Sequence, residues 1–152
     1  MTPNSNSPRR ALFAGSFDPF TIGHASILER ALDIFDSVVV AVGVNAAKNS
    51  SASQSQRLDN IKRLYPSPRV EVVAYDHELT VDLARRLNCS HLVRGVRSVA
   101  DFEYERNIAD INRQISGIDT VLLLALPEHA AISSSIVREL QSYNHDISSL
   151  IP

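Results

Sequence analysis

The sequence predicts an α/β fold: a five-stranded parallel sheet with helices on both faces. Short apolar runs alternate along the chain with segments of helical spacing, as in parallel-sheet proteins. The run at 38–44, VVVAVGV, is continuously apolar and β-branched, which is typical of a parallel strand covered on both faces. With 152 residues, 44% hydrophobic and 21% charged, the chain fits one domain. We expect that domain at residues 10–152, after a polar, disordered leader at residues 1–9.

Five apolar runs mark the expected strands. They lie at 11–14, 38–44, 70–74, 91–93 and 120–126. The last of them, TVLLLAL, is expected to be as buried as the others because all its residues but the first are apolar.

Apolar residues at helical spacing mark a helix after each run. The stripes are Ile27, Leu28, Ala31, Ile34 and Phe35 within 24–35; Leu58, Ile61 and Tyr65; Leu79, Leu83, Ala84 and Leu87; Tyr104, Ile108, Ile111 and Ile115; and Ile136, Val137, Leu140 and Tyr143. Thr21 is expected to cap the first helix, and Ser98 with Asp101 forms a capping-box pattern before the longest. The Ser- and Asn-rich stretch at 45–56 is predicted to be a mobile loop.

Composition limits the partners and the location of the chain. Fifteen Lys and Arg against seventeen Asp and Glu give a net charge of −2, which argues against duplex nucleic acid and membrane surfaces as partners. No apolar run approaches the roughly 18 residues of a membrane span. The single Cys89 excludes an internal disulfide and a cysteine zinc cluster, and it suits a cytoplasmic location.

The first candidate site segment is GSFDPFTIGH at 15–24, between the first strand and the first helix. A cap at Thr21 would place Gly23 and His24 in the first helical turn, where free N–H groups and the helix dipole favour phosphate. His24 would donate a hydrogen bond into that site. The alternative is an ordinary turn with a partly exposed histidine.

The second segment is RGVRSVADFEYE at 94–105, after the fourth strand. Guanidinium groups bind phosphate oxygens bidentately, so Arg94 and Arg97 around Gly95 indicate a polyphosphate or a phosphorylated substrate. Glu105 could accept hydrogen bonds from a sugar or a base. The alternative is a solvated charged face with one ion pair.

The third segment is ISSSIVRE at 132–139, after the fifth strand. Serines 133–135 at a helix start would present hydroxyls and N–H groups to an anion, although such a pattern alone is more often only a cap. Lys48 follows the second strand and adds a cation at the same edge of the sheet. Because ligands of parallel sheets bind at the carboxyl ends of the strands, these groups converge on phosphoryl or nucleotidyl transfer.

Several common sites are absent from the sequence. The first turn lacks both G-x-G-x-x-G and the P-loop pattern, and there is no Ser-His-Asp or Cys-His arrangement. No metal-binding cage of protein side chains is predicted. The remaining histidines are too scattered to ligate a metal, and we expect them to be structural or at the surface: His77, His91, His129 and His145.

These three segments, at these separations, resemble the bacterial phosphopantetheine adenylyltransferases over Ala11 to about Ile147. T-x-G-H alone would indicate the wider nucleotidyltransferase superfamily, whereas RGVRSVADFEYE is specific. The resemblance implies AMP transfer from ATP to 4'-phosphopantetheine, giving dephospho-coenzyme A and pyrophosphate in coenzyme A biosynthesis. It also implies Mg²⁺ bound through the ATP phosphates, a Rossmann-like nucleotidyltransferase domain, a homohexamer, and coenzyme A as a feedback ligand.

The resemblance also implies roles for individual residues. The catalytic residues are His24, Lys48 and Arg97. The ATP contacts are Ser16, Phe17, His24, Gly95, Val96, Arg97, Glu105, Ala130, Ala131, Ile132, Ser133, Ser134, Ser135 and Ile136. The substrate contacts are Ser16, Lys48, Thr80 and Arg94, with Tyr104 and Asn112 along the pantetheine arm.

Two departures from the family and two rival functions stay open. Ser16 stands where the family has Thr, and NSSASQSQ at 49–56 replaces a segment with a second Lys. One rival is a related nucleotidyltransferase acting on nicotinamide mononucleotide or glycerol phosphate. The other is a non-catalytic nucleotide-binding module on the same fold.

Overall fold

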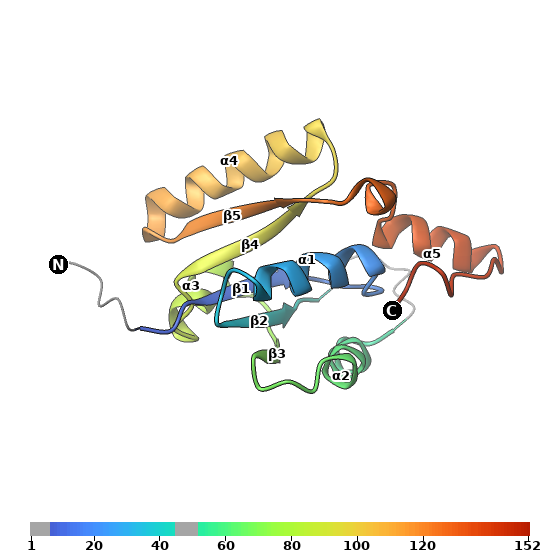
Figure 1. The fold of residues 1–152 in the computed structure, drawn as a ribbon, viewed down its shortest axis with the longest axis horizontal. Coiled ribbons are helices and arrows are strands. Elements are labelled where there is room, and N and C mark those ends of the chain that lie inside the picture. Colours follow the sequence, from blue (N-terminus) through green and yellow to red (C-terminus); the bar gives the residue numbers. More distant parts are fainter. Residues whose placement is uncertain (1–6, 45–51) are drawn as a thin grey trace.

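The computed structural model describes residues 7–44 and 52–152 of the chain (Figure 1). The first six residues of the expected leader, and most of the expected loop at 45–56, lie outside the described residues. None of the described helices is long and apolar enough to cross a membrane.

Five parallel strands form one sheet in the order β3-β2-β1-β4-β5. The strands are β1 (Arg10–Gly15), β2 (Ser37–Val42), β3 (Val70–Ala74), β4 (His91–Val96) and β5 (Asp119–Leu124). The order confirms the Rossmann-like sheet predicted from sequence. The fourth strand is three residues longer than the run HLV, because Arg94–Val96 continue to pair with β5 although only Val96 of the three is apolar.

Helices follow the strands on both faces of this sheet, as predicted. They are α1 (Ile22–Leu32), α2 (Gln54–Leu64), α3 (Thr80–Arg86), α4 (Val99–Ser116) and α5 (Ser134–Ser142), with a 3₁₀ turn η1 (Pro127–His129) before α5. The first helix ends three residues earlier than its apolar stripe, so Ile34 is 48% exposed. In Figure 1, α5 lies beyond the carboxyl ends of the strands.

Two apolar clusters, one on each face of the sheet, form the core. On one face, Leu28 of α1 and Ile61 of α2 pack against alternate residues of β1 and β2. On the other, Val81 and Leu83 of α3 pack with the intervening strand residues, together with Ile118 before β5. The single Cys89 is buried in this second cluster.

Strands β1 and β4 separate towards their carboxyl ends. They pair only at Ala11–His91 and Leu12–Leu92, whereas β1 and β2 pair from Arg10 to Gly15. The chain direction across the sheet reverses between these two strands, since α1 leads from β1 to one side and α4 from β4 to the other. Ligands of open parallel sheets bind at such a switch point, so this opening is the place to look for the site.

The structure corrects the expectation that the fifth strand is buried, and it shows that the α4 stripe is largely exposed. β5 is an edge strand, and Leu124 at its end is 67% exposed. Tyr104, Ile111 and Ile115 of α4 are 65%, 56% and 56% exposed. Helix α4 lies over β4 and β5, the last strands of the sheet, and the one buried residue of the helix is Glu105.

Candidate active site at the carboxyl ends of β1 and β4

Two cavities open where β1 and β4 separate. The larger has a volume of about 310 Å³, and its walls come from the β1–α1 turn, the end of β4, the start of α4 and the turn before α5. The smaller, of about 190 Å³, lies between α4, β1 and β4 on the opposite face. Both cavities are lined by Ala14, Gly15, Arg94 and Glu105, so these residues form a shared wall.

Most of the residues predicted to bind ATP line the larger cavity. They are Ser16, Phe17, His24, Gly95, Val96, Arg97, Glu105, Ile132, Ser133, Ser134 and Ser135. Ala130, Ala131 and Ile136 do not line it, and Ile136 is instead 45% exposed. Lys48 lies outside the described residues.

Thr21 caps α1, as predicted, and this cap fixes the ring of His24. The Thr21 side chain accepts a hydrogen bond from the His24 backbone N–H (3.2 Å), and the Thr21 backbone N–H donates to Nδ1 of His24 (3.0 Å). Nδ1 is therefore an acceptor, and in the neutral ring the proton must sit on Nε2. His24 thus holds an N–H donor at the wall of the larger cavity.

The environment of His24 keeps its imidazole neutral. Burial, together with the positive charges of Arg94 and Arg97, lowers the pKa of His24 from 6.5 to about 4. Phe20 stacks on the imidazole with 5.6 Å between ring centres, and Phe17 packs perpendicular to it at 5.0 Å, so two aromatic rings shield the imidazole from water. At neutral pH, His24 can donate a hydrogen bond without carrying a charge.

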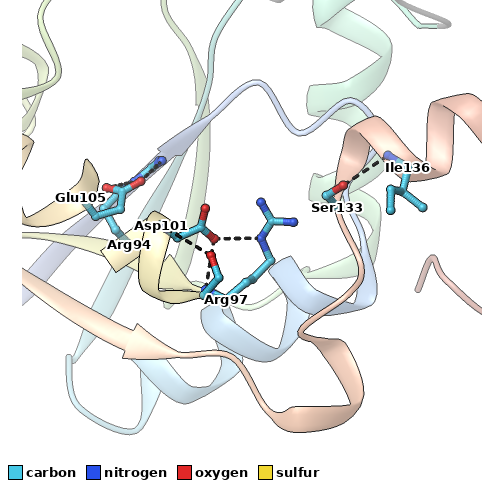
Figure 2. Close-up of polar contacts among 7 residues, drawn as sticks. Arg94, Arg97, Asp101, Glu105, Ser133 and Ile136 are labelled. Atoms are coloured by element: carbon cyan, nitrogen blue, oxygen red, sulfur yellow. Dashed lines mark hydrogen bonds and ion pairs between the residues drawn. The ribbon is translucent and has the colours of Figure 1, made fainter. Parts of the chain in front are cut away.

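Arg94 and Glu105 form a bidentate ion pair in the shared wall (Figure 2). Nε of Arg94 donates to Oε2 of Glu105 (3.0 Å), and Nη2 donates to Oε1 (2.8 Å). Nη1 donates to the carbonyl of Ala14 (2.6 Å), at the point where β1 has left β4. Burial alone would lower the pKa of Arg94, but its hydrogen bonds to Glu105 and the charge of that carboxylate raise it.

The ion pair limits which groups of Arg94 and Glu105 remain available to a substrate. Three N–H groups of Arg94 have protein acceptors, which leaves the remaining donors on its half-exposed guanidinium for a phosphate. Glu105 is 6% exposed and uses both carboxylate oxygens on Arg94. In this state the carboxylate orients Arg94.

Arg97 is held by Asp101 at the start of α4. Nε of Arg97 lies 3.2 Å from Oδ2 of Asp101, which also accepts a hydrogen bond from the Arg97 backbone N–H at 3.2 Å (Figure 2). Ser98 caps the helix by accepting from the Asp101 N–H (3.1 Å). Only half of the expected capping box forms, because the Asp101 carboxylate binds Arg97 rather than the backbone of Ser98.

The serine turn before α5 differs from the prediction in its hydroxyl groups. Ser133 accepts from the Ile136 N–H (3.2 Å) as the helix cap, Ser134 donates to the Pro19 carbonyl (2.8 Å), and Ser135 accepts from Arg138 (3.3 Å). The three hydroxyls thus hold the turn in place. What the turn offers an anion is the set of N–H groups in the first turn of α5, which have no partner within the helix.

The smaller cavity gathers the residues predicted along the pantetheine arm. Thr80, Tyr104 and Asn112 line it together with Tyr75, which the sequence did not indicate. Burial raises the pKa of the Tyr75 hydroxyl, so this group is a neutral donor. Tyr75 ends up here because Gly43 leaves room for it: a Cβ at Gly43 would lie 3.2 Å from the Tyr75 ring.

Sequence reasoning missed His129 and Arg57 near the larger cavity, and it included Arg138 in the segment 132–139 without giving it a partner. His129 was expected to be structural or at the surface, but it lines the cavity wall opposite Gly23. Arg138 donates to the Asp18 carbonyl (2.6 Å), and Arg57 donates to the carbonyl of Ser16. No motif marks His129 or Arg57; the P-E-H turn after β5 and an arginine in the first turn of a helix were the available signals.

The cavity walls suit anions rather than a protein-bound metal. Both carboxylates that line the larger cavity, Asp101 and Glu105, are paired with arginines. Within residues 7–44 and 52–152, no three His, Cys, Asp or Glu side chains are grouped to hold a metal ion. A divalent cation would fit here only if the ligand brought its own anionic oxygens.

Comparison with known proteins identifies the family. The sequence model of the cytidylyltransferase-like family matches residues 12–140. A phosphopantetheine adenylyltransferase from Bacteroides thetaiotaomicron is 50% identical over 145 residues, which are 95% of each chain. The chain belongs to the phosphopantetheine adenylyltransferase family. A member from Porphyromonas gingivalis is 53% identical over 143 residues, 93% of each chain, so the family likeness extends beyond the motifs to nearly the whole domain.

Solved structures support the fold assignment. A candidate nicotinate-nucleotide adenylyltransferase from Vibrio parahaemolyticus superposes with a TM-score of 0.63 at 17% identity, covering 95% of this chain and 94% of that one. A lipopolysaccharide core biosynthesis protein from Thermoplasma volcanium gives 0.61 at 16% identity, covering 79% and 98%. These likenesses show that phosphopantetheine adenylyltransferases share their sheet with a wider set of proteins.

Proposed function

We propose that this protein transfers AMP from ATP to 4'-phosphopantetheine, giving dephospho-coenzyme A and pyrophosphate in coenzyme A biosynthesis. The observation that carries the proposal is the shared wall: Arg94 and Glu105 border two cavities that open on opposite faces of one sheet edge. An enzyme that joins two phosphorylated substrates needs such an arrangement, with a cation between them.

The chemistry of the walls supports one substrate in each cavity. The larger cavity presents Arg97, His24 and the N-terminal turns of two helices, which suits the triphosphate and nucleoside of ATP. The smaller cavity is lined by Tyr104, Ile108 and Asn112, a mixture of apolar and amide-binding groups that suits the pantetheine arm. The free donors of Arg94 would then hold the substrate phosphate at the junction, with Lys48 as a second cation.

Catalysis requires no protein base. The substrate phosphate is already an anion and attacks the α-phosphorus of ATP in line, while pyrophosphate leaves. His24 donates its Nε2 proton as a hydrogen bond to the α-phosphate, where charge shifts in the transition state. Arg97 and the first-turn N–H groups of α5 hold the leaving phosphates, and the Ser16–Phe17 turn contacts both substrates.

Mg²⁺ belongs to this proposal as a cation bound by the ATP phosphates. It would neutralise part of the phosphate charge and polarise the phosphorus–oxygen bonds. The carboxylates of Asp101 and Glu105 are already paired with arginines. The chain itself therefore contributes by positioning the substrates and by donating hydrogen bonds.

The exposed face of α4 supports the proposal that the protein works as a homohexamer. Tyr104, Ile108, Ile111 and Ile115 follow one another at helical spacing on one face of α4 and are 37% to 65% exposed. An apolar surface this continuous usually marks a contact with another protein, and a second copy of the chain is the partner implied by the family. A cytoplasmic location, and coenzyme A as a feedback ligand in the smaller cavity, complete the proposal.

A substrate panel tests the function against both rivals. Pyrophosphate release is measured with Mg²⁺-ATP and, in turn, 4'-phosphopantetheine, nicotinamide mononucleotide and glycerol phosphate. We expect release only with 4'-phosphopantetheine, and dephospho-coenzyme A as the product. Release only with nicotinamide mononucleotide or glycerol phosphate would replace our substrate. ATP binding in calorimetry without release from any acceptor would favour a non-catalytic module.

A further inference from the structure

One arginine of helix α2 contacts the turn between β1 and α1 that carries Ser16 and Phe17, which we call the substrate turn. Arg57 lies in the first turn of α2, is 6% exposed, and donates hydrogen bonds to three backbone carbonyls. Its Nη1 binds the carbonyls of Ser16 and, at 2.9 Å, Gly43, and its Nε binds the carbonyl of Ala52 at 3.3 Å. A buried guanidinium that holds three carbonyls fixes the backbone segments that carry them.

The Arg57 guanidinium joins the segments that follow β1 and β2, just beyond the last backbone hydrogen bond between them. The last backbone bond between the two segments runs from the Gly43 N–H to the Gly15 carbonyl (2.8 Å). One residue further, the carbonyls of Gly43 and Ser16 cannot pair with each other because both are acceptors, and Nη1 of Arg57 bridges them. Gln54 adds a second tie from α2, donating to the carbonyls of Val42 and Tyr75 at 2.9 Å each.

The same contact orients the amide of Phe17. The Ser16 carbonyl and the Phe17 N–H belong to one planar trans peptide, so they point in opposite directions. With its carbonyl held by Arg57, this peptide directs the Phe17 N–H away from α2. No described residue accepts a hydrogen bond from that N–H, and both Ser16 and Phe17 line the larger cavity.

The backbone at Phe17 needs such support. Phe17 has a φ of 46°, in the left-handed region that bulky residues rarely adopt. Its ring is buried against Phe13 and Phe20, at 5.1 and 5.6 Å between ring centres, which fixes the side chain but not the preceding peptide plane. The contact from Arg57 supplies the second constraint.

We infer that Arg57 is a positioning residue: it turns the Ser16–Phe17 peptide so that the Phe17 N–H donates to a phosphate of the nucleotide in the larger cavity. This inference rests on the proposed function for the identity of the nucleotide. It assigns to α2 a part in catalysis that no motif in the helix indicates.

The chain offers a matched control in Arg69. This arginine also donates to three backbone carbonyls, those of Asp36 (2.9 Å), Phe35 (3.1 Å) and Leu32, but near the opposite ends of the strands. Arg57→Met and Arg69→Met therefore both remove a guanidinium that holds three carbonyls. Only the first change is next to the substrate turn. Arg57→Lys keeps the charge but loses the planar fork.

The test combines turnover with an NMR signal from one peptide. Ser16–Phe17 is the sole Ser–Phe pair in the sequence, so [¹³C-carbonyl]serine with [¹⁵N]phenylalanine labels that peptide alone. We expect Mg²⁺-ATP to shift this signal in the wild type and in Arg69→Met, and to shift it by less than half as much in Arg57→Met and Arg57→Lys. Below the melting temperature of each variant, we expect kcat to fall at least ~10-fold in both Arg57 variants and to stay within about twofold in Arg69→Met.

Failure of this inference and failure of the proposed function would give different results. A wild-type ATP shift and kcat in Arg57→Lys or Arg57→Met would overturn the inference, as would an equal loss in Arg69→Met. If Arg57→Met does not fold, Arg57→Lys decides alone. A wild-type protein that releases no pyrophosphate with 4'-phosphopantetheine would contradict the proposed function, while the ATP-induced shift would still decide the role of Arg57.

Discussion

Arg94 and Glu105 hold each other bidentately in the wall between two cavities, with donor–acceptor distances of 3.0 and 2.8 Å. Arg94 lies in the second half of strand β4 and Glu105 in the second turn of α4, so the pair ties the helix to the sheet at the edge of the site. Its geometry makes Glu105 the residue that sets the direction of the Arg94 guanidinium.

Glu105→Gln tests that role. The change keeps the shape of the side chain but removes the charge that faces Arg94, so we expect the free energy of unfolding in urea to fall by about 1.5–3 kcal/mol. We also expect KM for 4'-phosphopantetheine to rise, because Arg94 is no longer oriented. Asp110→Asn is the control on the same helix. It removes an exposed pair with Arg113 (3.2 Å) and should change stability by less than about 0.5 kcal/mol. Equal effects of the two changes would contradict a special role for Glu105.

His24 should make stability depend on pH. Its pKa is about 4 in the folded protein and 6.5 in the unfolded chain, so between these values the unfolded chain binds a proton that the folded protein does not. The free energy of unfolding should therefore fall as pH drops from 6.5 towards 4. His24→Gln retains a Thr-x-x-Gln capping box and does not titrate, so it should show a shallower fall over this range. Parallel curves for the two proteins would show that the pKa of His24 is not lowered.

Gly95 is predicted to be required for packing as well as for access to the cavity. A Cβ at this position would lie 3.0 Å from Cγ1 and 3.3 Å from Cδ1 of Ile27, so Gly95→Ala should cost about 1–3 kcal/mol of stability by overpacking. Ile27→Ala removes both Cγ1 and Cδ1 and gives the new methyl group room. In a double-mutant cycle from urea unfolding, we expect a coupling of at least ~0.5 kcal/mol that favours the double variant. Strictly additive costs would mean that the two residues do not compete for space.

The α4 surface should decide the oligomeric state. Ile111→Asp and Ile115→Asp place charges on the exposed apolar face, and we expect analytical ultracentrifugation to show a shift from a hexamer of 16.7 kDa chains to smaller species. Ile34→Asp is a suitable control, since Ile34 is 48% exposed but lies just after α1, away from that face. A monomeric wild type, or equal dissociation by Ile34→Asp, would contradict assembly through α4.

Local sequence signals predicted the fold well because they act over short distances. The continuous β-branched run of β2 and the cap at Thr21 each determine their element with little help from the rest of the chain. The apolar stripe of α4 shows what such local signals do not determine. Its helical spacing predicted a helix correctly, but periodicity cannot tell an apolar face that packs on the sheet from one that is exposed in a single chain.

The residues of the site were predictable where a sequence motif indicates their chemistry. His24, Arg94, Arg97 and Glu105 were predicted, and the structure brings them around one cavity. Contacts that join distant segments carried no such signal: Ser134 binds the Pro19 carbonyl, and Arg57 reaches Ser16 from 41 residues away. Tertiary geometry alone determines these partners.

The central claim is that a neutral His24 donates from Nε2 to the reacting phosphate, and His24→Ala tests it most directly. ATP affinity is measured by calorimetry and turnover by pyrophosphate release, with His24→Gln as the variant that keeps the helix cap. We predict that His24→Ala binds ATP within a few-fold of the wild type but turns over more than ~100-fold more slowly, because the lost hydrogen bond strengthens only in the transition state. Turnover close to that of the wild type in a folded His24→Ala protein would contradict the account.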